Sequence, residues 1–259
     1  MKVSENTILI TGGTSGIGFE LAKQFLALGN TVIITGRDQA KLDRVQRDWP
    51  QLRTMQSDAA DPESIRALYG RVTREYPKLN ILINNAGIMR KINLQDGETC
   101  LEDLSEEIET NLTGLVWMAK QFLPHLQRQP NSAIVNVSSG LAFVPFPISP
   151  VYCATKAGVH SFTQSLRAQL KHTNIKVFEL APPGTRTPLL DAFASDMKGT
   201  PMMDVKKLVR KTIAAFRKDR LEIRPGASNV LKLMSRIAPG LMLRALSGPV
   251  DGMLAQTKL

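Results

Sequence analysis

Short apolar runs alternate with longer amphipathic stretches along the first 180 residues of the chain. Runs rich in Ile, Val and Leu are typical of strands that are buried on both faces of a sheet. Stretches with apolar positions three and four residues apart are typical of helices that cover such a sheet. The alternation predicts an α/β fold with a doubly wound parallel sheet of Rossmann type, in three layers.

The same pattern gives approximate positions for each element. We expect strands at residues 7–11, 31–35, 52–56, 79–83, 133–137 and 174–180. We expect helices at 19–28, at 39–48, from Pro62, at 104–127, from Tyr152 and at 204–216. No linker, repeat or low-complexity segment interrupts the chain, so we expect one domain over residues 1–259, in which 226–259 form a helical extension.

The composition describes a globular chain. Apolar residues make up 43% of it, and no apolar run reaches the roughly 18 residues that a membrane span needs. The first strand pattern follows Met1 so closely that we expect no secretory signal. The two cysteines and three histidines show no ligand or redox spacing, so we expect a cytoplasmic protein without a metal site.

The net charge of +10 is unevenly distributed. Residues 1–130 contain 15 basic and 16 acidic side chains, whereas residues 131–259 contain 18 and 7. A basic half favours an anionic partner, which is a cofactor, a membrane surface or nucleic acid. Aromatic residues are only 5% of the chain and no nucleic-acid-binding motif is present, so we expect no nucleic acid.

A glycine cluster, Thr11-Gly-Gly-Thr-Ser-Gly-Ile-Gly18, lies between the first predicted strand and the first predicted helix. Gly12 permits a tight turn, Gly16 lets the main chain approach a pyrophosphate, and Gly18 allows close packing of the helix. The N-terminus of that helix attracts anions. The context predicts a dinucleotide site, against the alternative of a glycine turn that binds nothing.

The end of the second strand distinguishes NADP from NAD. An acidic residue there binds the ribose hydroxyl of NAD, but this chain has Gly36 followed by Arg37. The guanidinium of Arg37 suits a 2′-phosphate, so we expect NADP, unless Arg37 is a solvated residue before the next helix. Thr14 and Ser15 add hydroxyl donors.

Polar residues also follow the third and fourth strands. Asp58 is placed to accept a hydrogen bond from the adenine amino group, and Asp61 to cap the helix that begins near Pro62. Asn84-Asn-Ala-Gly87 follows the fourth strand, where its small and amide side chains either approach the cofactor or form a plain turn.

A hydroxyl, a phenol and an amine follow the fifth strand. Ser138 and Ser139 end that strand, and Tyr152 and Lys156 share one face of the next helix because they are four residues apart. We expect the Lys156 ammonium to lower the Tyr152 pKa from about 10, as a general acid–base near neutrality requires. Asn111 is a poor helix former inside the predicted helix 104–127, which indicates a specific role for its amide.

Taken together, these motifs resemble the short-chain dehydrogenase/reductase family in its single-domain form, over residues 7 to about 190. The resemblance implies a catalytic tetrad, with Ser139 chosen over Ser138 by its spacing from Tyr152: Asn111, Ser139, Tyr152 and Lys156. It implies the following cofactor-binding residues: Gly12, Thr14, Ser15, Gly16, Ile17, Gly18, Arg37, Asp58, Asn85, Tyr152, Lys156, Thr185 and Thr187.

The implied reaction is hydride transfer between NADP(H) and a carbonyl or alcohol. Tyr152 would transfer the proton, Ser139 would hold the oxygen, and Lys156 would bind the nicotinamide ribose. Asn111 would order a water that relays protons to Lys156. The family also implies a homodimer or a homotetramer.

One motif departs from the family pattern. In Pro182-Pro-Gly-Thr-Arg-Thr187 a proline, Pro183, stands where the family usually has glycine, and it removes a main-chain donor. This bears on the implied role of Thr185 and Thr187, which is to hold the nicotinamide carboxamide. More narrowly, Glu222-Ile-Arg-Pro-Gly226 and the segments around Ser139 and Tyr152 resemble bacterial oxidoreductases named after the D-alanylation of lipoteichoic acid.

Residues beyond 187 are expected to serve the substrate. Residues 188–215 fit a lid, and an apolar pocket would be completed by Leu141, Phe143, Val144 and Phe146. The helical extension is basic and is interrupted at Pro239-Gly240. It is either a helix pair that covers a dimer or substrate edge, or a peripheral contact with an anionic membrane.

Two functions follow from these observations. The first is an NADP-dependent oxidoreductase that interconverts an apolar carbonyl compound and its alcohol. The second is an NADP-binding regulatory or scaffolding protein on the same fold. All four residues of the tetrad are present, which favours the enzyme.

Overall fold

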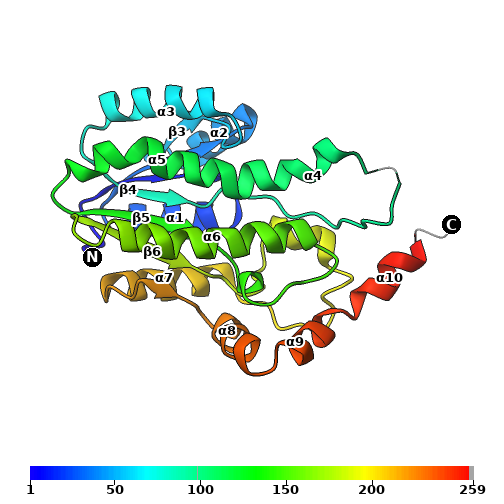
Figure 1. Cartoon of the computed structure of the whole chain (residues 1–259). Helices are drawn as coiled ribbons and strands as arrows, with labels where there is room; N and C mark the ends of the chain where they lie inside the picture. Colours follow the sequence, from blue (N-terminus) through cyan, green and yellow to red (C-terminus); the bar gives the residue numbers. More distant parts are fainter. Residues whose placement is uncertain (98, 257–259) are drawn as a thin grey trace.

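The computed structural model of the chain describes residues 1–97 and 99–256. Within this part, seven parallel strands form one sheet in the order β3-β2-β1-β4-β5-β6-β7 (Figure 1). The strands are β1 Thr7–Ile10, β2 Thr31–Gly36, β3 Arg53–Gln56, β4 Leu79–Asn84, β5 Ser132–Val137, β6 Ile175–Leu180 and β7 Glu222–Ile223. The predicted doubly wound sheet is confirmed, and only the two-residue β7 is too short to leave a sequence pattern.

Two layers of helices cover the sheet (Figure 1). One face packs on α1 Gly16–Ala27, α2 Gln39–Asp48 and α7 Val205–Arg217. The other face packs on α3 Pro62–Glu75, α5 Gly114–Gln127 and α6 Pro150–Gln169. The three-layer prediction is therefore confirmed.

The strands alternate between two hydrophobic cores. In β1, Ile8 and Ile10 pack against α1 and α7, whereas Leu9 faces the opposite core, and all three are fully buried. Because both faces of the sheet are covered, the strands are largely apolar, and their buried polar residues, such as Asn136 and Glu179, lie toward the carboxyl ends. The carboxyl ends of the strands carry the candidate site, as open α/β sheets require.

The predicted helical region 104–127 is confirmed, but it begins at Leu101 and includes a π-helical turn. The chain forms α4 Leu101–Ile108, then a π-helical turn at Glu109–Thr113, and then α5. A Cβ atom on Gly114 would lie 1.9 Å from the Ala59 carbonyl oxygen, so the helix packs directly on the loop after β3. The π turn contains Asn111, and such turns are frequent at functional sites.

Side-chain caps fix where two helices begin. Asp61 accepts hydrogen bonds from the Glu63 N–H at 2.9 Å and the Ser64 N–H at 3.2 Å, and Pro62 is the first residue of α3. This confirms the predicted cap. Asp38 caps α2 in the same way, through the Lys41 N–H at 3.1 Å.

The chain after β6 begins with a 3-10 helix and several turns rather than a long helix. The 3-10 helix spans Pro188–Phe193, and the three helices after β7 are α8 Ala227–Ile237, α9 Pro239–Leu246 and α10 Pro249–Gln256. The break at Pro239 agrees with the prediction, and residues 257–259 of the predicted extension lie outside the described residues. Within the described ranges no helix combines the length and the apolarity needed to cross a bilayer.

Candidate active site

The glycine turn between β1 and α1 has the conformation that only glycine adopts easily. The φ angles of Gly12 and Gly16 are 64° and 56°. Gly13, which the sequence analysis did not single out, is just as constrained, because its Cβ would lie 2.4 Å from the Ile34 Cβ. Gly13 therefore packs directly on β2, whereas Gly12 and Gly16 line the cavity and leave their main chain open to a ligand.

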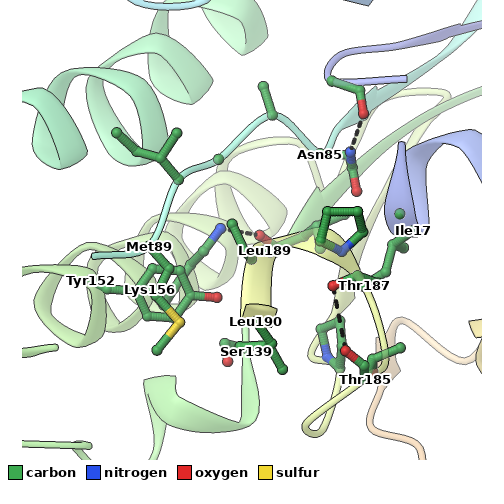
Figure 2. A pocket seen from close by; sticks show the side chains of 18 of the residues that line it. Ile17, Asn85, Met89, Ser139, Tyr152, Lys156, Thr185, Thr187, Leu189 and Leu190 are labelled. Carbon is green, nitrogen blue, oxygen red and sulfur yellow. Dashed lines mark hydrogen bonds between the residues drawn. The ribbon is translucent and has the colours of Figure 1, made fainter. Parts of the chain in front are cut away.

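Asn85 ties the glycine turn to the end of β4 (Figure 2). Its amide nitrogen donates to the main-chain oxygens of Thr11 and Gly12, both at 3.0 Å. The Thr11 hydroxyl accepts in return from the main-chain N–H groups of Asn85 and Ala86. Asn85 therefore holds two loops in register, and a plain turn does not account for these contacts.

A cavity of about 620 Å³ opens at the carboxyl ends of the strands. Most of the predicted site residues line it: Gly12, Thr14, Ser15, Gly16, Ile17, Arg37, Asp58, Asn85, Ser139, Tyr152, Lys156, Thr185 and Thr187. Gly18 and Asn111 lie behind the lining, where Gly18 packs against Asn85. The residues that the sequence analysis collected from distant segments thus meet around one cavity.

Ser139, Tyr152 and Lys156 are grouped together at this cavity (Figure 2). Tyr152 is only 6% exposed, and the neighbouring Ser139 side chain lowers the pKa of its phenol. The Lys156 Nζ lies 5.6 Å from the centre of the Tyr152 ring and donates to the Val137 carbonyl at 3.0 Å. The group places a phenol, a hydroxyl and a buried amine side by side at the cavity.

The expected direction of the Tyr152 pKa shift is wrong for this structure. Burial raises the Tyr152 pKa well above 10, and the nearby Ser139 hydroxyl only partly opposes that increase. The Lys156 amine is directed at the Val137 carbonyl rather than at the phenol oxygen. At neutral pH the phenol therefore keeps its proton, which is the form that can donate to a ligand oxygen.

Burial lowers the Lys156 pKa to about 8, because the charged ammonium is less stable in the protein than in water. The variant Lys156→Met is therefore expected to raise the free energy of unfolding by about 1 kcal/mol at pH 7. The gain from not burying a charge exceeds the cost of leaving the Val137 carbonyl without its donor. Because the unfolded lysine has the higher pKa, 10.5, the stability of the wild type rises between pH 8 and about 10.5. Urea unfolding at several pH values measures this.

The difference between wild type and Lys156→Met should shrink as the pH rises through this window. Lys171→Met, at an exposed lysine, is the matched control and should show no such trend. A stability difference that is constant from pH 7 to 10 would contradict the buried charge.

Asn111 uses its whole amide for contacts within the protein. Its Oδ1 accepts from the Ile88 N–H at 2.8 Å, and its Nδ2 donates to the Ile88 carbonyl at 2.9 Å and to the Thr155 hydroxyl at 3.2 Å. It is fully buried. Its side chain therefore joins the loop after β4 to α6, the helix that carries Tyr152 and Lys156.

The other end of the cavity is lined by two cations and by the carboxylates of Asp38 and Asp58. Arg37 is 62% exposed, and its guanidinium lies 3.6 Å from a carboxylate oxygen of Glu106. Lys41 also lines the cavity, although the sequence analysis missed it; its place one turn into the helix after Arg37 was the available signal. Asp58 directs one carboxylate oxygen to the Ala60 N–H at 2.9 Å.

Thr185 and Thr187 line the cavity with hydroxyls that already have partners (Figure 2). The Thr185 hydroxyl donates to the Pro183 carbonyl at 2.7 Å, and the Thr187 hydroxyl donates to the Thr185 carbonyl at 3.4 Å. The segment also pairs with Met203 in an isolated bridge. The loop is thus shaped by its own hydrogen bonds despite the proline at position 183.

The apolar end of the cavity differs in part from the prediction. Leu141 and Phe146 line it, but Phe143 and Val144 do not. Phe143 packs edge-on against His160 instead, and Val144 is buried. The remaining apolar lining comes from the loop after β4, the lid region and the C-terminal helices, chiefly Met89, Leu189, Leu190, Met197, Leu231, Leu246 and Pro249.

Behind Ser139 lies a buried polar network that the sequence analysis missed. Ser138 donates to one carboxylate oxygen of the fully buried Glu179 at 2.5 Å, and His160 Nδ1 lies 2.7 Å from the other. Ligand atoms of His160, Glu179 and Glu222 lie within 4.8 Å of one another. Glu222 is already paired with Lys232 and Arg224, so cations of the protein take the place that a metal ion would need.

Comparisons with known proteins agree with this geometry. A sequence model of the family described as short chain dehydrogenase matches residues 6–198. The uncharacterized oxidoreductase DltE of Bacillus subtilis (strain 168) is 50% identical over 189 residues, which are 73% of this chain and 75% of its own. The NADP-dependent 3-hydroxy acid dehydrogenase YdfG of Escherichia coli O6:H1 is 31% identical over 176 residues, 68% of this chain and 71% of its own.

A solved structure shows the same fold. It is that of a short chain dehydrogenase/reductase from Burkholderia phymatum in complex with NAD, with a TM-score of 0.81 at 20% identity, covering 91% of this chain and 95% of that one. The family resemblance inferred from the motifs is confirmed, including its narrower form. The chain belongs to the short-chain dehydrogenase family of NAD(P)-dependent oxidoreductases.

Proposed function

We propose that the protein is an NADP(H)-dependent reductase that interconverts an apolar carbonyl compound and its alcohol. The observation that carries this proposal is the grouping of Ser139, Tyr152 and Lys156 in the cavity that the glycine turn also lines. The apolar side chains at the other side of that group, among them Phe146 and Leu190, favour an apolar substrate.

The cavity fits a dinucleotide. Gly12 and Gly16 open the main chain at the N-terminus of α1, where a pyrophosphate is stabilised. A Cβ on Gly87 would lie 3.4 Å from the Lys156 Nζ, so the glycine keeps the space beside the amine free. Asp58 would meet the adenine, and Thr185 and Thr187 the nicotinamide. Residues 188–215 would form the lid.

When bound, the nicotinamide ring supplies or accepts the hydride. In reduction, Tyr152 donates its proton to the carbonyl oxygen and Ser139 holds that oxygen by a hydrogen bond. Lys156 holds the ribose and stabilises the phenolate that remains. Asn111 positions α6, the helix that carries Tyr152 and Lys156, through its hydrogen bond to Thr155.

Two cations favour NADP over NAD. Arg37 and Lys41 both line the cavity beside Gly36, where an acidic residue would select NAD. The Escherichia coli relative is itself named as NADP-dependent. The Glu106 carboxylate near Arg37 is exposed enough to be displaced by a phosphate.

Arg37→Ala is expected to weaken NADPH binding by about 10–100-fold and to leave NADH binding unchanged. The reason is that only NADPH carries the phosphate that the guanidinium meets. Lys41→Ala should have a smaller effect in the same direction. Fluorescence titration with both cofactors measures this.

Arg44→Ala is the matched control, because Arg44 is exposed on α2, the helix that follows Arg37, and does not line the cavity. Equal affinity of the wild type for NADH and NADPH would contradict the proposal. A panel of apolar ketones and aldehydes with the preferred cofactor then tests turnover. Cofactor binding with no turnover on the whole panel would favour the regulatory or scaffolding function.

Two further expectations belong to this proposal. We place the protein in the cytoplasm, since Cys100 is exposed and Cys153 is buried and both are free thiols, as a reducing compartment favours. We also expect a homodimer or a homotetramer, which sedimentation measures directly.

A further inference from the structure

Helices α8 and α9 expose five large apolar side chains to solvent. Val230, Leu233 and Ile237 follow one another at the spacing of a single helix face, and they are 57%, 59% and 68% exposed. Leu241 and Leu243 continue the apolar surface on α9. Isolated exposed leucines are ordinary, but a continuous stripe marks a surface that binds something.

The charges around this stripe have one sign. Between Arg224 and Val250 the sequence contains no acidic residue, and Arg236 and Arg244 are exposed. Helix α7 likewise has basic residues and no acidic residue within Val205–Arg217. A groove of about 530 Å³ lies between α7 and the start of α8; Lys211, Lys218 and Arg220 line it, together with one carboxylate, Glu222, which is paired with Lys232.

The opposite side of the same helices serves the active site. Leu231 of α8 and Leu246 of α9 line the substrate end of the cavity. Figure 1 shows α8, α9 and α10 following the lower edge of the molecule, away from the sheet. The exposed stripe and the cavity therefore lie on two sides of one helical arm, α8–α9.

These observations favour one partner over another. A second copy of the chain would bring arginines and lysines of one arm against those of the other, in a protein with a net charge of +10. In an anionic bilayer, the acyl chains can contact the apolar stripe and the lipid phosphates can pair with the basic side chains. We propose that the α8–α9 arm docks the protein on an anionic membrane surface.

The test is sedimentation of the full chain with vesicles. We expect binding to vesicles of phosphatidylcholine with about 30% phosphatidylglycerol, little binding to phosphatidylcholine alone, and release at high salt. The double variant Leu233→Glu/Ile237→Glu should lower the partition coefficient at least about tenfold. Arg236→Gln/Arg244→Gln should lower it severalfold while keeping the apolar stripe.

Leu101→Glu is the matched control, since Leu101 is an equally exposed leucine on α4, and it should bind vesicles like the wild type. Failure of the wild type to bind anionic vesicles would overturn the proposal. Equal binding to neutral and anionic vesicles would also overturn it. If the double variant mainly reduced the mass of an oligomer in solution, the stripe would instead be assigned to a contact with a second copy of the chain. Vesicle binding is measured without cofactor or substrate, so its outcome is independent of the reductase test.

Discussion

Tyr152→Phe is expected to reduce turnover about 10³-fold and to change NADPH affinity by less than about threefold. Burial raises the pKa of the phenol, so Tyr152 holds its proton at neutral pH and can donate it to a carbonyl oxygen. Phenylalanine keeps the ring and its packing but has no proton to transfer. The loss should therefore lie in kcat rather than in KM.

Tyr76→Phe is the matched control, because Tyr76 lies after α3 and does not line the cavity. Ser139→Ala should lower kcat less, by about 10²-fold, since it removes a hydrogen bond to the oxygen but leaves the proton donor. If Tyr152→Phe kept a tenth of the wild-type rate, another group would have to supply the proton and the assignment of Tyr152 would be wrong.

Much of the fold and of the site follows from local patterns. Strands buried on both faces, such as β1 and β5, leave unbroken apolar runs, and caps such as Asp61 are visible because their chemistry is confined to one turn. Tyr152 and Lys156 are brought together by the helix period alone. These features need no knowledge of the tertiary structure.

The features that the sequence did not predict depend on contacts between segments that are far apart in the chain. The rise in the Tyr152 pKa comes from burial, which a sequence motif does not report. The Glu179 carboxylate contacts Ser138 and His160 from two other elements, so its isolated place in an apolar strand gave no hint of a network. The π turn at Asn111 forms where the helix meets the loop after β3, a contact set by the sheet order.

Gly18→Ala is expected to destabilise the fold by about 1–3 kcal/mol and to weaken NADPH binding at least about tenfold. Its new Cβ would lie 2.4 Å from both the Asn85 amide nitrogen and the Gly12 carbonyl oxygen. Those two atoms form one of the hydrogen bonds that hold the glycine turn to the end of β4. The methyl group must push one of them away, so the main chain that would bind the pyrophosphate moves with it.

Chemical denaturation and NADPH titration of the same preparation separate the two effects of Gly18→Ala. Gly70→Ala is the matched control, because Gly70 lies in α3 with no heavy atom within 4 Å of its Cβ position, and it should stabilise the protein by about 0.5–1 kcal/mol. If Gly18→Ala lowers the free energy of unfolding and Gly70→Ala raises it, the contact with Asn85, and not the loss of glycine's flexibility, decides the effect at position 18. If the Gly18→Ala variant had the same stability and the same NADPH affinity as the wild type, the turn would not depend on this contact. The proposed role of Asn85 in shaping the cofactor site would then be wrong.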